Sequence, residues 1–204
     1  MKRLFLTGNG TDVGKTLIAA ILCQALGADY WKPVQCGSLE RSDSDLVREL
    51  VTNVSFKCHP EGLRLKAPMS PHAAAALEGR KIGLAELIAP ITDNLLLIEG
   101  AGGLMVPLNQ YELMLDLIAA LEAEVVVVSR NYLGSINHTL LTLEALKARG
   151  LPIAGIIFNG GSTPSSEDII QSYSKIRCLG HVPQLKRIDA ETVAEQARNF
   201  ARVL

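Results

Sequence analysis

The feature that most constrains this chain is a glycine-rich turn, GNGTDVGKT, at residues 8–16. It follows an apolar run at residues 4–6, which predicts a short buried strand. It precedes a second apolar run at residues 17–22, which predicts a helix packed against that strand. A strand, a glycine-rich turn and a helix are the context that a phosphate-binding P-loop requires. The turn therefore predicts an α/β fold with an anion site near its N-terminus.

The residues of this turn suit phosphate chemistry. Glycines let backbone N–H groups point inward at the start of a helix, where the dipole also favours an anion. Lys15 can reach the β- and γ-phosphates, and the Thr16 hydroxyl can bind Mg²⁺. The spacing is unusual, because five residues separate Gly8 from Gly14 and Asn9 holds the first usual glycine position. An ordinary glycine-rich turn is the alternative, but the flanking strand and helix favour a phosphate site.

Length and composition predict one α/β domain over residues 1–204, since 48% of the residues are hydrophobic and 20% charged. A formal net charge of −1 without a basic block argues against a nucleic-acid partner. The 4 cysteines are scattered without metal-type spacing, which indicates a reducing compartment. No apolar stretch is long enough to span a membrane, and the first one is too short for a signal peptide. We expect a cytoplasmic protein with no membrane partner.

Apolar runs typical of buried strands alternate with longer amphipathic segments. Strands are expected at residues 3–7, 30–33, 95–99, 125–129, 153–159 and 178–182. Helices are expected at residues 15–26, 45–51, 71–78, 84–91, 113–122, 136–149, 166–175 and 190–203. This alternation predicts a mostly parallel sheet with helices on both faces, and ligands beyond the carboxyl ends of the strands.

Two polar side chains end predicted strands. Lys32 leaves the second strand just before a proline and can point at a γ-phosphate held by Lys15; a surface lysine beside a turn is the alternative. Glu99 follows four aliphatic residues, which is a Walker-B-like pattern, and a carboxylate there binds the metal or its water. An exposed turn acid is the alternative for Glu99, and the pattern favours the metal role.

Three further positions have two explanations each. The residues SDSD at 42–45 form a good helix N-cap, and the alternative is that one aspartate binds Mg²⁺. Ser135 is expected to cap a helix, although a helix N-terminus after a glycine also suits a phosphate or a carboxylate. Asn159 ends a strand at an Asn-Gly turn, or it offers its amide to an adenine edge.

Several segments together resemble the dethiobiotin synthetase family over nearly the whole chain. They are the loop at 8–16, KPV at 32–34, SD at 44–45, SPH at 70–72, EGAGG at 99–103, LGSINH at 133–138, and Asn159. The resemblance implies a single-domain P-loop NTPase-like fold and a homodimeric ligase that uses ATP and Mg²⁺. Such a ligase converts 7,8-diaminononanoate, CO₂ and ATP to dethiobiotin, ADP and phosphate, through a carbamate that ATP phosphorylates.

The resemblance also implies roles for individual residues. Lys15 and Lys32 would be catalytic, because cations must offset the repulsion where a carbamate meets a phosphoryl group. The metal ligands would be Thr16, Asp45 and Glu99, which favours the metal role over the cap for Asp45. The nucleotide would contact Thr11, Asp12, Val13, Gly14, Lys15, Thr16, Asn159 and Pro183. The substrate would contact Lys32, Cys36, Leu133, Ser135 and Asn137, the last three holding its carboxylate across the dimer interface.

The chain departs from the family pattern at three places. Asp12 stands where the family often has Glu, and the loop between Leu39 and Ser42 is short. Cys36 stands where Ser or Thr usually contacts the substrate, and a thiol is the weaker hydrogen-bond donor. Two nearby lysines predict a lowered pKa and a reactive Cys36 thiol. The alternative is that Cys36 is a small residue filling space beside the loop.

Three other functions compete. A nucleotide switch of the partitioning or septum-positioning type has a second lysine five residues before the first, where this chain has Gly10. A related amidoligase usually carries a glutaminase domain, which we do not expect at this length. A binding module that lost catalysis is disfavoured because both lysines and all three metal candidates are present.

Overall fold

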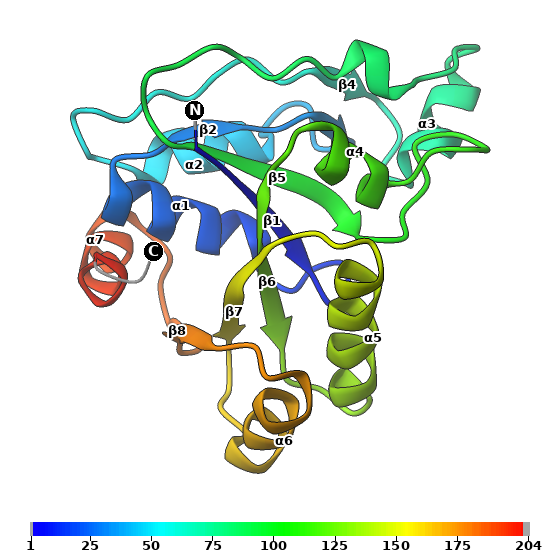
Figure 1. Ribbon diagram of the computed structural model, residues 1–204. Helices are drawn as coiled ribbons and strands as arrows, with labels where there is room; N and C mark the ends of the chain where they lie inside the picture. The colour runs from blue at the N-terminus through cyan, green and yellow to red at the C-terminus, as the bar shows by residue number, and fades with distance from the viewer. Residues whose placement is uncertain (1, 202–204) are drawn as a thin grey trace.

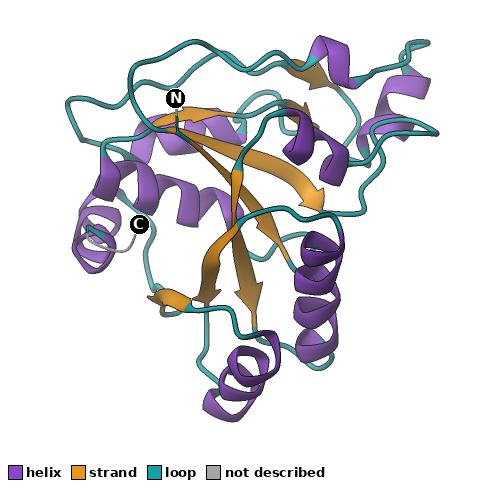
Figure 2. Cartoon of the chain, in the orientation of Figure 1, coloured by secondary structure: helices purple, strands orange, loops and turns teal. Residues whose placement is uncertain are grey.

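A six-stranded parallel sheet forms the centre of the computed structural model, which describes residues 2–201 (Figures 1 and 2). Its strand order is β2-β5-β1-β6-β7-β8. The strands are β1 (Arg3–Gly8), β2 (Asp29–Trp31), β5 (Leu96–Gly103), β6 (Glu124–Arg130), β7 (Ile153–Asn159) and β8 (Cys178–Val182). Every pair is parallel, so the predicted parallel sheet is confirmed.

Helices cover both faces of the sheet, as predicted. One face carries α1 (Lys15–Leu26), α2 (Asp43–Leu50) and α7 (Ala190–Ala197). The other carries α3 (Pro71–Leu77), α4 (Met114–Ala120), α5 (Ser135–Ala148) and α6 (Pro164–Ser174). Figure 1 shows α1 and α7 on the left of the sheet and α5 on its right.

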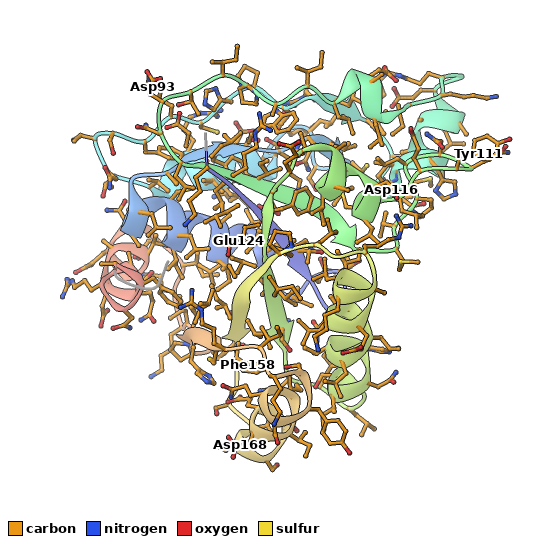
Figure 3. All side chains as sticks on the ribbon, in the orientation of Figure 1. Asp93, Tyr111, Asp116, Glu124, Phe158 and Asp168 are labelled. Atoms are coloured by element: carbon orange, nitrogen blue, oxygen red, sulfur yellow. The ribbon has the colours of Figure 1, made fainter. Side chains whose placement is uncertain are left out.

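Alternating side chains of the buried strands face these two layers. Leu4 and Leu6 pack in the core under α1, whereas Phe5 packs in the core on the opposite face. Phe158, labelled in Figure 3, lies on β7 and belongs to the core that α6 also covers. Because side chains alternate along a strand, a strand that is apolar at every position can fill both cores at once.

A second sheet, which the sequence analysis did not predict, pairs β3 (Val34–Cys36) with β4 (Leu63–Leu65). Its two strands are parallel, with Val34 opposite Leu63. Strands of three residues show too little alternation for a pattern to reveal them. This small sheet matters for function because Cys36 ends it beside the main cleft.

Three of the expected elements differ from the structure. The helix expected at 84–91 is wrong, because only a short 3-10 turn, η1 (Leu84–Glu86), forms there. Pro90 cannot donate a helical hydrogen bond and disfavours helical backbone at the preceding residue. The strand expected at 30–33 ends at Trp31, which leaves Lys32 free of the sheet ladder. The helix expected at 190–203 ends at Ala197.

A second 3-10 turn, η2 (Arg198–Phe200), follows α7, and residues 202–203 of that expected helix lie outside the described residues. Across residues 2–201, no helix combines the length and the apolar character needed to cross a bilayer. The remaining expected helices and strands are present with their ends shifted by at most a few residues.

Candidate active site

A cleft of about 750 Å³ opens beyond the carboxyl ends of β1, β2 and β5. The ends of β1 and β5 adjoin, with Gly8 paired to Gly103, so the two strand ends meet as expected (Figure 1). Eight residues with predicted site roles line this cleft: Thr11, Asp12, Gly14, Lys15, Thr16, Lys32, Cys36 and Glu99.

The turn at residues 8–16 brings the end of β7 against the start of α1. Gly14 has φ +91°, and a Cβ there would lie 2.0 Å from Asn159 Nδ2. Asn159 Nδ2 donates to the Val13 carbonyl at 2.8 Å. Glycine is therefore required at position 14 by both its backbone conformation and the close approach of Asn159.

Pro183 lies beside this junction rather than in the cleft. It follows β8 and is exposed, and the Gly160 N–H donates to the preceding Val182 carbonyl at 2.8 Å. Neither Asn159 nor Pro183 lines the main cleft. Both lie at the carboxyl ends of strands β7 and β8, next to the turn that was predicted to bind nucleotide.

Lys15 is a nearly buried cation at the first position of α1. It is 7% exposed, and its Nζ donates to the Gly10 carbonyl at 3.3 Å. Burial lowers the pKa of Lys15, although the negative charge of Glu99 opposes that shift. An ammonium group has three donors, so Lys15 retains donors for an anion in the cleft.

Lys32 joins two carboxylates at the edge of the same cleft. Its Nζ lies 2.9 Å from Glu99 Oε1 and 2.5 Å from Asp43 Oδ2. Burial opposes the charge of Lys32, but Glu99 and Asp43 outweigh burial and raise its pKa. Lys32 is 4% exposed and Glu99 1% exposed, so this is a buried charge cluster rather than a surface ion pair.

Glu99 is held in place by two hydroxyl groups in addition to Lys32. Thr16 Oγ1 donates to Glu99 Oε1 at 3.0 Å, and Tyr30 Oη donates to Glu99 Oε2 at 2.9 Å. Thr16, Asp43 and Glu99 thus offer the oxygen ligands that a hard cation prefers. No group of three His, Cys, Asp or Glu within residues 2–201 is arranged to hold a metal by itself. Mg²⁺ needs only one or two carboxylates when substrate phosphates and water complete its shell, so the oxygen donors fit it.

The structure does not bring Asp45 to this cluster, contrary to the predicted ligand set. Asp45 Oδ2 accepts from the Ser42 N–H and from Ser42 Oγ, both at 3.0 Å, and its other oxygen accepts from Arg48 at 2.6 Å. These bonds form a capping box at the start of α2 and lower the pKa of Asp45.

Asp43 is the aspartate of this segment that lies at the cleft. It is the first residue of α2, lines the cleft and pairs with Lys32. The sequence held a signal for this arrangement, because Ser42 followed three residues later by an acid is typical of a capping box. That pattern assigns Asp45 to the cap and leaves Asp43 for the site.

Cys36 lines the cleft, as expected, but its predicted lowered pKa is wrong. Burial raises the pKa of Cys36 to about 11, and the opposing effect of Lys32 is smaller. Besides Asp43, the cleft includes ten residues that were given no individual role in the predicted site: Val34, Gln35, Ser38, Pro68, Met69, Ser70, Pro71, Ala101, Gly102 and Val106. Most of them lie in or next to the small β3-β4 sheet, which had not been predicted: Val34 and Gln35 belong to β3, Ser38 follows it, and residues 68–71 follow β4.

The three residues expected to hold the substrate carboxylate lie outside the cleft. Leu133 and Asn137 are exposed near the start of α5, whereas Ser135 is buried. None of the three lines the cleft of their own chain. Gly134 is the N-cap of α5, with φ +101°, and no side chain caps this helix.

Comparison with known proteins adds independent information. A family model described as "AAA domain" matches residues 2–192. The chain is 48% identical over 203 residues to an ATP-dependent dethiobiotin synthetase BioD from Christiangramia forsetii, covering 100% of this chain and 98% of that relative. It is 50% identical over 198 residues to the protein of the same name from Cytophaga hutchinsonii, covering 97% and 96%.

Solved structures with the same fold are more distant in sequence. The cell division ATPase MinD of Pyrococcus furiosus matches with a TM-score of 0.62 and 17% identity over 100% of both chains. A putative plasmid partition protein from Borrelia burgdorferi, bound to AMPPNP, matches with a TM-score of 0.63 and 12% identity over 99% and 97%. At these identities the likeness shows the P-loop ATPase fold alone.

Proposed function

This chain belongs to the dethiobiotin synthetase family, and we propose that the cleft at the ends of β1, β2 and β5 is where it performs the reaction of that family. The enzyme is an ATP-dependent ligase of biotin biosynthesis. It adds CO₂ to 7,8-diaminononanoate and closes the ureido ring, giving dethiobiotin, ADP and phosphate. The observation that supports this placement is the convergence of Lys15, Lys32 and Glu99 in one cleft.

Lys15 and the backbone of the P-loop hold the ATP phosphates in this proposal. Lys15 begins α1, where the helix N-terminus adds its own attraction for an anion. Lys32 lies across the cleft and offsets the repulsion between the carbamate and the γ-phosphate. Positioned cations of this kind act without reorganising during phosphoryl transfer, which is how such sites lower the barrier.

Thr16, Asp43 and Glu99 are the residues that we assign to Mg²⁺. When bound, Mg²⁺ supplies positive charge to the phosphate oxygens. Tyr30 and Lys32 hold the Glu99 carboxylate by hydrogen bonds at 2.9 Å each, so Glu99 is oriented before any ligand enters. Asp43 replaces Asp45 in this assignment because Asp45 is occupied by the α2 cap.

The nucleotide base is assigned to the junction of Asn159 with the P-loop, with Thr11, Asp12, Val13, Gly14 and Pro183 around it. Cys36 and Lys32 face the diamine in the cleft. The substrate carboxylate is assigned to Leu133, Ser135 and Asn137 of a second copy of this chain, because these residues lie outside the cleft of their own chain. We further propose a homodimer of one-domain subunits, each comprising residues 1–204, located in the cytoplasm.

The test is the dependence of phosphate release on the other substrates. The protein is incubated with ATP, Mg²⁺, 7,8-diaminononanoate and bicarbonate, and dethiobiotin is measured by mass spectrometry. We expect one phosphate per dethiobiotin, and little phosphate when either the diamine or bicarbonate is left out. Phosphate release at an equal rate without the diamine would instead support a nucleotide switch, the class of the MinD-like structures.

A further inference from the structure

A network of buried polar side chains connects the P-loop to α5, and through Thr139 to the Ser135 carbonyl in its first turn. It consists of Asn9 in the loop, Ser129 near the end of β6, and Thr139 in α5. Asn9 is 7% exposed, and Ser129 and Thr139 are fully buried. None of the three lines the cleft, so the proposed reaction does not explain them.

The hydrogen bonds of this network of Asn9, Ser129 and Thr139 run in one consistent direction. Asn9 Nδ2 donates to Thr139 Oγ1 at 3.0 Å and lies 3.3 Å from Ser129 Oγ. Ser129 Oγ and Thr139 Oγ1 are 2.9 Å apart. Thr139 Oγ1 donates to the Ser135 carbonyl at 2.7 Å. Because Thr139 has one hydroxyl proton and gives it to Ser135, it accepts from both Asn9 and Ser129.

The other end of the Asn9 amide is also fixed. Asn9 Oδ1 accepts from the Arg130 N–H at 3.4 Å, and the Asn9 N–H donates to the Val128 carbonyl at 3.0 Å. The amide nitrogen contacts both β6, through Ser129 Oγ and the Arg130 carbonyl at 3.4 Å, and α5, through Thr139 Oγ1, so the amide is held between the two elements. A satisfied buried network of this kind makes the parts that it connects rigid with respect to one another.

These contacts link two regions that were assigned to different active sites. Asn9 belongs to the loop that holds the phosphates in its own subunit. Ser135, at the far end of the network, begins the segment that is assigned to the substrate carboxylate in the partner subunit. We propose that Asn9 is a positioning residue that fixes the start of α5, and so adjusts diamine binding in the site of the other subunit. This inference rests on the proposed binding across the dimer interface.

Packing alone does not account for this arrangement. A buried position that needs only to be filled would be served by an apolar residue, which avoids the cost of desolvating an amide. The Asn9 amide instead bonds the hydroxyls of Ser129 and Thr139, which lie more than 100 residues away in sequence, and those two hydroxyls bond each other. Thr139 also ties Asn9 to Ser135 rather than to the middle of the helix, so the effect is directed at the α5 start.

The test uses mixed dimers that contain a single working site. The receiver chain carries Asn137→Ala and keeps its P-loop intact. The donor chain carries Lys15→Ala, so its own site is inactive and it contributes only its α5 segment. The two chains carry different affinity tags, and the heterodimer is purified through both before KM for the diamine and KM for ATP are measured.

Asn9→Ala is then added to the donor chain, whose P-loop no longer takes part in catalysis. We expect KM for the diamine to rise about five-fold, the worth of one neutral hydrogen bond, with KM for ATP unchanged. Thr139→Val in the donor chain should give the same increase, because it removes the same contact from the α5 side. Thr139→Ser retains the hydroxyl and should restore the original KM.

The matched control is Thr142→Val in the donor chain. Thr142 makes the same kind of bond within α5, to the His138 carbonyl at 2.8 Å, without contacting Asn9. It should leave KM for the diamine unchanged. Melting temperatures of all variants are measured to confirm that each chain is folded.

Two results would overturn the inference, and they differ. An active parent heterodimer whose diamine KM does not respond to Asn9→Ala or Thr139→Val in the donor chain would show that the network is structural only. A parent heterodimer without activity, in a preparation that contains both chains, would remove the cross-interface site itself. The second result would overturn that part of the proposed function together with the role of Asn9.

Discussion

The cluster around Glu99 is buried and fully hydrogen-bonded, whereas the loop before α5 is exposed. Glu99 is 1% exposed, and both of its oxygens accept hydrogen bonds. Leu133 is fully exposed, and neither Leu133 nor Asn137 lines the cleft. The cluster around Glu99 is organised within a single chain, whereas we propose that the end assigned to the substrate carboxylate is completed by a second copy. Substitutions in the Glu99 cluster should therefore lower the activity of the subunit that carries them. Substitutions in the loop should act by weakening the dimer.

The largest effect is expected at Lys15. Replacing it with alanine removes a positioned cation from phosphoryl transfer, which costs on the order of 3 kcal/mol or more, at least about a hundred-fold in rate. The fold should remain, because burial lowers the pKa of Lys15 and its charge therefore disfavours the folded state. Phosphate release and melting temperature are the measurements. Lys57→Ala, at an exposed lysine, is the control, and near-normal turnover of Lys15→Ala would remove Lys15 from the mechanism.

The next effect separates the two aspartates of α2. Asp43→Asn should raise the Mg²⁺ concentration needed for half-maximal rate by roughly ten-fold or more, since even outer partners of a metal ligand matter that much. Asp45→Asn serves as the matched control and should leave the Mg²⁺ dependence unchanged while slightly lowering the melting temperature. The reverse result would return the metal role to Asp45 and contradict the arrangement described above.

The next effect is expected on assembly rather than on the metal dependence, when the loop is made unsuitable for dimer contact. Leu133→Glu places a charge where we propose that a second copy packs, and losing that burial costs about 2 kcal/mol in each subunit, so the dimer dissociation constant should rise by at least roughly thirty-fold. Sedimentation over a range of protein concentrations measures this, together with KM for the diamine. Tyr173→Glu, at another exposed apolar residue on α6, should change neither quantity. If Leu133→Glu dimerises normally, the loop is not part of the interface.

The smallest effect is expected at Cys36. Cys36→Ser keeps the size of the side chain and should leave turnover within roughly two-fold. The pKa of about 11 means that the thiol is protonated at neutral pH, so alkylation should be slow there. Because the thiolate is the reactive form, the rate should rise roughly ten-fold per pH unit up to that pKa. Fast alkylation at pH 7, measured by mass spectrometry against a small free thiol, would contradict the raised pKa.

The sequence was sufficient to predict the central sheet and the P-loop because both depend on neighbouring residues. The apolar run at 153–159 and the glycine-rich turn at 8–16 each contain their whole signal within a few positions. Lys32 and Glu99 were also identified as site candidates, since the ends of parallel strands meet at one edge. The structure places both in the cleft and joins them at 2.9 Å.

What could not be predicted depends on partners that are distant along the chain. β3 and β4 are recognisable only by their pairing, Val34 with Leu63, which neither short segment specifies alone. The structure places Asp43 rather than Asp45 at the cleft. Asp45 bonds within the local cap of α2, whereas Asp43 pairs with Lys32, which is distant along the chain. The raised pKa of Cys36 follows from burial by residues of other segments, whereas the nearby lysines visible in the sequence suggested the opposite direction.

The position of β1 in the middle of the sheet also has a consequence for how the enzyme is made. β1 leaves the ribosome before its two neighbours, β5 and β6, which end at Gly103 and Arg130. The nucleotide loop that follows β1 is therefore made well before the strands that support it exist. During that time its apolar strand is unpaired, which is the condition in which nascent chains depend on chaperones.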